Sequence, residues 1–413
     1  MLNVTLLSSE WRSSKGGLST ISRELAIQLA KHPDLKVSVY LPQCSEDDKK
    51  VASSHNVQLI EAEELLGFDP INWLTVAPAN HVMDYVIGHG LLLGRYAQIF
   101  KRQHQCKVWI QVVHTAPEEL GKYKTYEDAI SKAEKKHKTE VKLCEMADQV
   151  VAVGPKLKEV FSRYLRYCKK DQAVINLTPS IFSEFSHVKQ STEERKTFDV
   201  LMLGRGNSED FQLKGYDIVA KAIAHLGLPF RLTFVGAPSG KEDEVTNQFL
   251  ELGIDRSQLT VRCFNENREE LAKLFCEVDL ATMPSRTEGF GLVALEALSA
   301  SLPVLVSGNS GVGEALKKVP YGSQWVVDSE NPKDWANAIR IVQRKDRELR
   351  LEEIKILSEK YAAKFSWDGQ CKLLVERMLN ITPGNFYYVL YLYVRDCEVI
   401  CYESVISGYI VCF

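Results

Sequence analysis

The chain has 413 residues, long enough for two domains, since single cores stop growing at about 250–300 residues. Hydrophobic residues make up 45% and charged residues 25%, which is typical of a globular protein, and the net charge of -3 argues against a nucleic-acid-binding protein. The ten cysteines form no C-x-x-C pair and no cluster with zinc spacing, which favours reduced thiols and a cytoplasmic location.

In the first half of the chain, short apolar runs alternate with stretches of helical periodicity. Strands are predicted at residues 3–8, 36–41, 57–61, 84–87, 107–113, 149–153 and 173–177. Helices are predicted at residues 18–31, 91–103, 126–146 and 156–167. The N-terminal residues lack the pattern of a signal peptide, and no stretch reaches the ~20 apolar residues of a membrane span.

The second half of the chain repeats this rhythm. Strands are predicted at residues 198–203, 231–235, 260–264, 280–283, 303–306 and 324–327. Helices are predicted at residues 215–225, 245–252, 268–278, 291–300, 311–318 and 332–344. Near-continuous Val, Ile and Leu strands indicate parallel sheets covered on both faces. Two such series in tandem predict an α/β protein with two doubly wound, Rossmann-like domains and a ligand cleft between them.

The strongest motif follows the predicted strand at 280–283 and reads PSRTEGFGLVALEA over residues 284–297. A helix that begins at such a turn presents unpaired backbone N–H groups, which bind anions. Glu288 lies in the turn and Glu296 lies inside the helix, and carboxylates accept hydrogen bonds from hydroxyls. A phosphate-binding helix start beside two hydroxyl-binding carboxylates is suited to a sugar nucleotide.

Two cations follow the predicted strand at 198–203. Arg205 comes directly after this strand, and Lys214 is predicted to open the next helix. Arginine can bind a diphosphate as a bidentate fork and lysine can bind it as a point charge. If this motif stood alone, the simpler interpretation would be that the Arg and Lys side chains are solvated and surround a loop without binding a ligand.

Two further candidate sites end strands of the first half. Gly16 and Gly17 separate the first predicted strand from the first helix, where backbone N–H groups can approach a phosphate. His114 ends the strand at 107–113 and faces the predicted cleft, with a structural histidine as the alternative. His89 also ends a strand and is a lesser candidate.

Together these segments resemble the GT-B retaining glycosyltransferases, the group 1 family that includes sucrose-phosphate synthases and phosphatidylinositol mannosyltransferases. The resemblance covers roughly residues 1–380 and is strongest at about 198–315, where Glu288 and Glu296 match the family's E-x7-E signature. It implies that Glu288 and His114 contact the donor sugar and that Glu296 contacts the nucleotide ribose.

The resemblance also implies how the diphosphate is held. Arg205 and Lys214 would neutralise it, so that no cofactor and no metal ion are required. Backbone groups would hold the donor at Gly16, Gly17, Phe290, Gly291 and Leu292. The implied reaction is transfer of a hexosyl group, with retention, from a UDP-, GDP- or ADP-linked sugar to a hydroxyl acceptor, which the sequence does not identify.

The predicted domains are residues 1–190 for the acceptor and 191–364 for the donor. A helix at 365–381 would cross back to the first domain, and residues 382–413 form a divergent tail without a family counterpart. Segment 299–303 lacks the family's glycine before its Pro-Val strand, which concerns structure more than catalysis.

The sequence leaves three alternatives open. An inactive GT-B domain could serve as a ligand-sensing or protein-interaction module, because fold does not fix function. A sugar-nucleotide epimerase of the same architecture would need an additional acid/base pair near the sugar. The lysine-rich stretch 122–142 is interleaved with acidic residues and predicts a solvated, ion-paired helix, with a docking face for anionic lipid or an acidic acceptor as the alternative.

Overall fold

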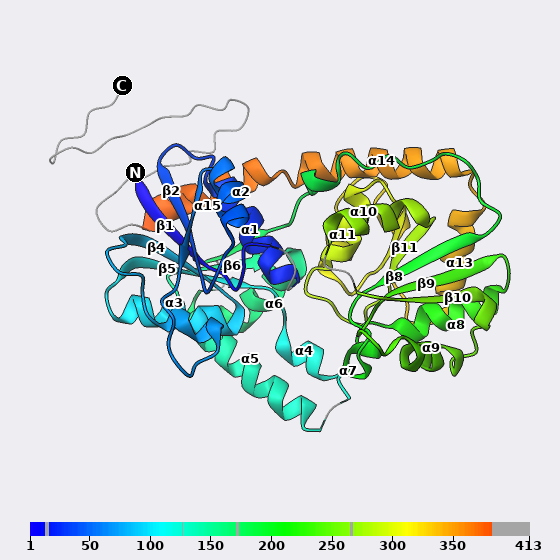
Figure 1. Ribbon diagram of the computed structural model, residues 1–413, viewed down its shortest axis with the longest axis horizontal. Coiled ribbons are helices and arrows are strands. Elements are labelled where there is room, and N and C mark those ends of the chain that lie inside the picture. The colour runs from blue at the N-terminus through cyan, green and yellow to red at the C-terminus, as the bar shows by residue number, and fades with distance from the viewer. Residues whose placement is uncertain (13–15, 126, 171–172, 265–266, 382–413) are drawn as a thin grey trace.

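A computed structural model describes residues 1–12, 16–125, 127–170, 173–264 and 267–381. Figure 1 shows two parallel sheets side by side, each covered by helices, with the last described helix along the first domain. The predicted tail at 382–413 lies outside the described residues.

The first sheet has seven parallel strands in the order β3-β2-β1-β4-β5-β6-β7. Their bounds are β1 (Leu2–Leu7), β2 (Leu35–Leu41), β3 (Val57–Glu61), β4 (Met83–His89), β5 (Cys106–Val113), β6 (Gln149–Val153) and β7 (Val174–Leu177). Every residue of β4 and β6 is buried, as expected for strands covered on both faces. The covering elements are α1 (Gly17–Leu29), α2 (Glu46–Ser54), η1 (Pro70–Thr75), α3 (Gly90–Arg102), α4 (Pro117–Gly121), α5 (Ala129–Met146), α6 (Pro155–Tyr164) and η2 (Leu165–Cys168).

The second sheet has six parallel strands in the order β10-β9-β8-β11-β12-β13. Their bounds are β8 (Phe198–Leu203), β9 (Phe230–Ala237), β10 (Leu259–Cys263), β11 (Leu280–Met283), β12 (Val304–Ser307) and β13 (Val326–Val327). The surrounding elements are η4 (Ser183–Phe185), α7 (Ser208–Phe211), α8 (Tyr216–Leu226), α9 (Glu242–Leu250), η5 (Arg256–Gln258), α10 (Arg268–Glu277), α11 (Leu292–Ser299), α12 (Gly311–Lys317), η6 (Ser323–Trp325) and α13 (Pro332–Gln343). The predicted fold class of two doubly wound domains is confirmed.

Two long helices connect the domains at the C-terminal end. In Figure 1, α14 (Arg347–Lys364) runs along the second domain, and α15 (Trp367–Ile381) lies against α1 of the first. Tyr85 of β4 donates a hydrogen bond to the carbonyl of Met378 at 2.9 Å. The side chain of Gln370 bonds to both the N–H and the carbonyl of Thr178, at 2.6 and 2.8 Å.

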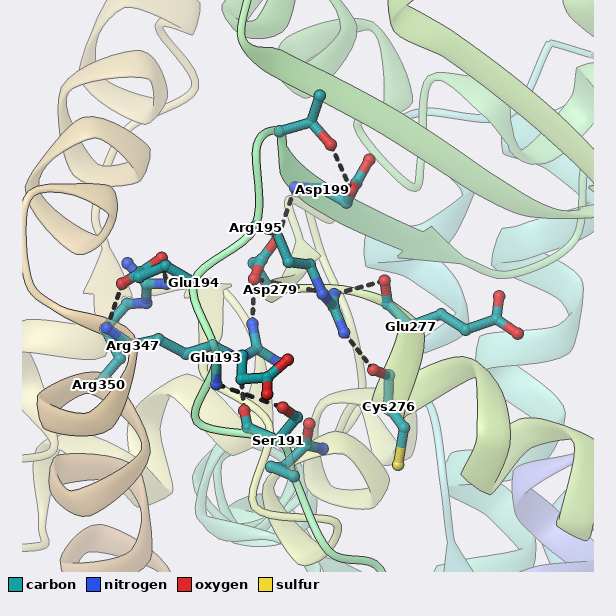
Figure 2. A network of polar contacts seen from close by, with 12 residues as sticks. Ser191, Glu193, Glu194, Arg195, Asp199, Cys276, Glu277, Asp279, Arg347 and Arg350 are labelled. Carbon is teal, nitrogen blue, oxygen red and sulfur yellow. Dashed lines mark hydrogen bonds and ion pairs between the residues drawn. The ribbon is translucent and has the colours of Figure 1, made fainter.

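Figure 2 shows the hydrogen bonds and ion pairs that connect the segment between the two sheets to α14. The buried guanidinium of Arg347 pairs with the buried carboxylate of Asp279 and donates to the carbonyl of Ser191 at 2.6 Å. Arg350 pairs with Glu194 at 3.2 Å. Because α14 buries these arginines among charged partners, its apolar periodicity is weak, and the sequence did not predict this helix.

A serine takes the place of the missing family glycine. Ser301 follows α11 with φ of 55°, in the left-handed region that favours glycine and that costs other residues on the order of 1 kcal/mol. The chain nevertheless turns into β12 there, so the departure in segment 299–303 is accommodated by backbone strain.

Candidate functional site

A cavity of about 880 Å³ lies between the carboxyl ends of the two sheets. Both domains line it, because both doubly wound sheets direct their strand ends toward it. The predicted site residues that line it are Gly16, Gly17, His114, Arg205, Lys214, Glu288, Phe290, Gly291 and Leu292. Segments far apart in the sequence therefore form a single site.

Lys214 and Glu288 are in direct contact in this cavity. The Nζ of Lys214 lies 2.5 Å from Oε2 of Glu288, and the hydroxyl of Ser285 lies 3.4 Å from the same oxygen. Lys214 directly precedes Gly215, the N-cap of α8, so the helix begins one residue later than predicted and Lys214 lies at its start. The left-handed conformation of Gly215, with φ of 66°, lets the chain turn into the helix at that point.

Arg205 belongs to the second domain, and its guanidinium group lies close to the start of α1 in the first domain. Its side chain is exposed and has no hydrogen bond or ion pair with any residue that the structure describes. A Cβ placed on Gly16 would lie 3.9 Å from Nη2 of Arg205, and one on Gly17 would lie 2.9 Å from a methyl group of Leu292. The start of α1 therefore lies next to both Arg205 and the start of α11. The backbone N–H groups of these two helix starts and the guanidinium group of Arg205 can bind the same anion.

The two candidate histidines contact each other. Nδ1 of His89 lies 2.9 Å from Nε2 of His114, and burial lowers the pKa of His114 to about 4. Burial also lowers the pKa of His89 well below its usual value. Both rings are therefore neutral near pH 7, and one ring donates to the other. Only His114 lines the cavity, so His89 can act on a ligand through His114 alone.

Glu296 is placed differently from Glu288. It is 6% exposed, and it is not among the described residues that line the cavity. Its Oε1 accepts a hydrogen bond from Nη1 of Arg268 at 2.7 Å, and Arg268 also pairs with Glu184. Burial, the largest influence, raises the pKa of Glu296, while Arg268 lowers it. Sequence spacing gave no signal for Arg268 or Glu184 as partners of this carboxylate.

A buried polar cluster joins the domains beside the cavity and was not predicted. Nζ of Lys156, at the start of α6, lies 2.6 Å from the hydroxyl of Thr287, 3.0 Å from the carbonyl of Asn309 and 3.0 Å from Glu119. The hydroxyl of Thr287 donates to Glu119 at 2.9 Å. Thr287 directly precedes Glu288, so this cluster fixes the turn that carries Glu288 against the first domain.

The structure corrects the interpretation of the lysine-rich stretch. Glu134 and Lys138 form the expected exposed pair, at 2.5 Å and four residues apart on α5. Glu140, however, is 2% exposed and lines the cavity, so it does not lie on a solvated face. Lys124 pairs across the cavity with Asp210 of the second domain at 2.8 Å.

We expect Glu140→Gln to make the protein less sensitive to alkaline pH. Burial raises the pKa of Glu140 from 4.5 to about 8. The folded state therefore keeps a proton that the unfolded state loses, and the stability contributed by this group falls as the pH rises between these two values. The Tm of the wild type should fall more between about pH 5 and about pH 8 than that of Glu140→Gln.

Thermal unfolding followed by circular dichroism measures this difference. Glu145→Gln changes an exposed glutamate of the same helix and should keep the wild-type dependence on pH. Equal pH dependence in all three proteins would show that Glu140 is already charged in the folded state.

In the part of the chain that the structure describes, no group of three or more His, Cys, Asp or Glu side chains is arranged to hold a metal ion. Over the same residues, no helix is long and apolar enough to cross a membrane.

A family model described as Family 4 Glycosyltransferase in conflict systems matches residues 5–374. The D-inositol 3-phosphate glycosyltransferase of Corynebacterium urealyticum is 32% identical over 176 residues, which are 40% of each protein. The protein of the same name from Rhodococcus erythropolis is 32% identical over 173 residues, 40% of this chain and 38% of that protein. The chain thus spans about two fifths of the length of these curated relatives.

Solved structures share the two-domain fold. Sucrose-phosphate synthase from Thermosynechococcus elongatus has a TM-score of 0.70 at 19% identity, over 92% of this chain and 98% of that one. HepE of Anabaena in complex with UDP and glucose has a TM-score of 0.65 at 16% identity, over 92% and 99%. The fold is therefore GT-B. Because the family model extends from β1 into α15, the chain belongs to the family 4 glycosyltransferases of conflict systems.

Proposed function

We propose that the protein transfers a hexosyl group from a nucleoside diphosphate sugar to a hydroxyl acceptor, with retention at the anomeric carbon and without a metal ion. One observation carries this proposal: Arg205 and the Lys214–Glu288 pair line a single cavity opposite the glycine-rich start of α1. Family membership supports it, and HepE of Anabaena, which shares the fold, has been solved with UDP-glucose.

In the proposed donor complex, the diphosphate lies between Arg205 and Lys214. Backbone N–H groups at the helix starts add further donors, from Gly16 and Gly17 on one side and from Phe290, Gly291 and Leu292 on the other. Two cations and two helix starts can stabilise the charge of the departing diphosphate, which is the role a metal ion would otherwise have.

Hydroxyl groups of the donor have separate partners in this proposal. Glu288 accepts from the donor sugar, and the neutral ring of His114 forms a hydrogen bond to the same sugar. Glu296 accepts from the ribose through Oε2, because Arg268 bonds to Oε1. It lies one helical turn beyond Val293, which lines the cavity, so the ribose would sit at the inner end of α11.

The proposed reaction does not require a side chain that acts as a base. The bond between the anomeric carbon and the diphosphate oxygen breaks, and the acceptor oxygen bonds to the same face of that carbon. The proton of the acceptor hydroxyl passes to the departing phosphate oxygen. Burial lowers the pKa of His114 to about 4, which makes this ring a weak base and favours the departing phosphate as the proton acceptor.

We expect one family of nucleotides among UDP, GDP and ADP, with its sugar conjugates, to stabilise the protein against heat. A ligand at 100 times its Kd stabilises by about 2.7 kcal/mol. Turnover of the matching sugar nucleotide should be insensitive to EDTA, and NMR of the first-formed product should show the anomeric configuration of the donor. A folded protein that none of these ligands stabilises would instead support an inactive, ligand-sensing or interaction module.

A further inference from the structure

A line of alternating charges runs from α11 to α1. Arg268, the first residue of α10, donates from Nη1 to Oε1 of Glu296 at 2.7 Å and pairs through Nη2 with Glu184. Arg23 of α1 pairs with Glu184 at 3.3 Å and with Glu24 at 3.4 Å. These five side chains are between 8% and 28% exposed, so solvent and salt screen them less than an ion pair at the surface.

The guanidinium group of Arg268 has a fixed orientation. Its two terminal nitrogens bond to two different carboxylates, one on α11 and one on η4. Its central carbon lies 4.8 Å from the centre of the Phe185 ring, a position in which an aromatic face attracts a cation. Phe185 is buried and packs edge-to-face against Phe275, with 5.6 Å between the ring centres. Two ion pairs and a packed ring therefore hold this planar group in place before any ligand binds.

Glu296 depends on Arg268 for its charge and for its orientation. The carboxyl group of Glu296 is buried, and burial favours the protonated form. Among the described residues, Arg268 alone bonds to this carboxyl group, which leaves Oε2 able to accept from a ligand. Glu296 follows Val293 of the cavity lining by three residues, on the same face of α11. Without Arg268, this carboxyl would lack a counter-charge and would take up a proton.

The second partner of Arg268 is itself held by the first domain. Oε1 of Glu184 accepts from Arg268, and Oε2 of Glu184 accepts from Nη2 of Arg23 at 3.3 Å. Arg23 lies on α1, the helix that begins at Gly17 in the cavity lining. The helix start proposed to bind the diphosphate is thus connected, through Glu184 and Arg268, to the carboxylate proposed to bind the ribose.

We infer that Arg268 is a positioning residue for ribose recognition, which keeps Glu296 charged and directs its Oε2 to a hydroxyl of the nucleotide ribose. Arg268 does not touch the nucleotide in this arrangement and acts only through Glu296. The inference rests on the proposed donor site and adds a residue outside its sequence motif. Loss of Arg268 should therefore impair recognition of the ribose hydroxyls and leave the diphosphate contacts of Arg205 and Lys214 intact.

The experiment compares a ribonucleotide with its deoxy forms, by calorimetric titration of the full chain. The probes are UDP, 2′-deoxy-UDP and 3′-deoxy-UDP, or the corresponding forms of GDP or ADP if one of these is the nucleotide that stabilises the protein. In the wild type, at least one deoxy form should bind about tenfold more weakly than UDP, because it lacks a hydroxyl that bonds to a charged acceptor.

Arg268→Gln should weaken UDP about tenfold and leave the weaker deoxy form unchanged, so that the preference for ribose disappears. Arg268→Lys keeps the charge without the planar fork and should recover part of the preference. If Arg268→Gln does not fold, Arg268→Lys carries the test, with a preference below that of the wild type. The matched control is Arg262→Gln, which removes an exposed arginine that pairs with Glu277 at 2.7 Å and should bind all probes like the wild type.

A double-mutant cycle tests whether Arg268 acts through Glu296. Glu296→Gln should also abolish the preference for ribose, and the addition of Arg268→Gln should then have no further effect on the affinity for UDP. A general structural role of Arg268 would instead weaken all three probes equally, and the effects of the two substitutions would add.

Three results with the variants would overturn the inference: equal weakening of UDP and its deoxy forms by Arg268→Gln, additive effects in the cycle, or an equal effect of Arg262→Gln. Equal binding of all three probes to the wild type would also overturn it, because Glu296 would then make no contact with the ribose. Failure of the proposed function is distinguishable from these results, since the wild type would then bind no nucleotide at all.

Discussion

Lys214→Ala should lower kcat by about 10²–10³-fold, the effect of removing one group that stabilises charge in a transition state. Lys214 lies 2.5 Å from Glu288 and lines the cavity with Arg205. Its loss removes one of two cations proposed to hold the diphosphate and leaves the Glu288 carboxylate without its ion pair. The variant should also lose most of the thermal stabilisation by the nucleotide, measured beside steady-state turnover.

Two control variants separate this effect from a general loss of charge. Lys221→Ala removes an exposed cation of α8 outside the cavity lining and should keep wild-type turnover. Lys214→Arg retains the charge and should recover part of kcat. If Lys214→Ala turns over like Lys221→Ala, the diphosphate is held elsewhere.

Gly289→Ala should reduce turnover by about 10²-fold or more, because misplacement of a reacting group by about 1 Å can have this effect. A Cβ at position 289 would lie 2.1 Å from the carbonyl oxygen of His114, which belongs to the other domain. Since this oxygen is part of the backbone, the turn carrying Glu288 must move away from the strand end carrying His114. Steady-state kinetics with the cognate sugar nucleotide measures the loss.

The matched control is Gly369→Ala in α15, where a Cβ meets only the side-chain oxygen of Ser366, at 3.0 Å. This variant should keep wild-type turnover. Circular dichroism should show that Gly289→Ala is folded, because the strain falls on a turn rather than on either sheet. Normal turnover in a folded Gly289→Ala protein is the result that contradicts a closely apposed pair of domains at this point.

The contacts between the domains explain why both changes should act on catalysis. Lys156, Glu119 and Thr287 form a buried cluster next to Glu288, and Lys124 reaches Asp210 across the cavity. A turn of the second domain is thus positioned by polar groups of the first. The proposed donor site is therefore complete only when the two domains are in contact.

Much of the architecture followed from local sequence patterns. The predicted strands match β1 to β13, and the predicted helices match most of the long ones, because parallel strands and their covering helices have distinct apolar periodicities. Helices α2, α4, α7 and α14 were not predicted. In α14, Arg347 and Arg350 are buried while charged residues occur throughout the helix, which removes the apolar signal.

The positions of the candidate site residues were predictable for a related reason. Gly16, His114, Arg205 and Glu288 each follow a strand, and parallel sheets bring their carboxyl ends to one edge. A motif that follows a parallel strand is therefore expected at the edge of the sheet that lines the cavity.

The pairings inside the site were decided by the tertiary structure alone. The spacing of Glu288 and Glu296 did not show that one lines the cavity while the other is buried against Arg268. Nor did the lysine-rich stretch show that Glu140 lies in the cavity wall. Local periodicity fixes the face of an element on which a side chain lies. The partners and the exposure of that side chain depend on elements that are distant in the chain. These elements come into contact only when the two domains pack together.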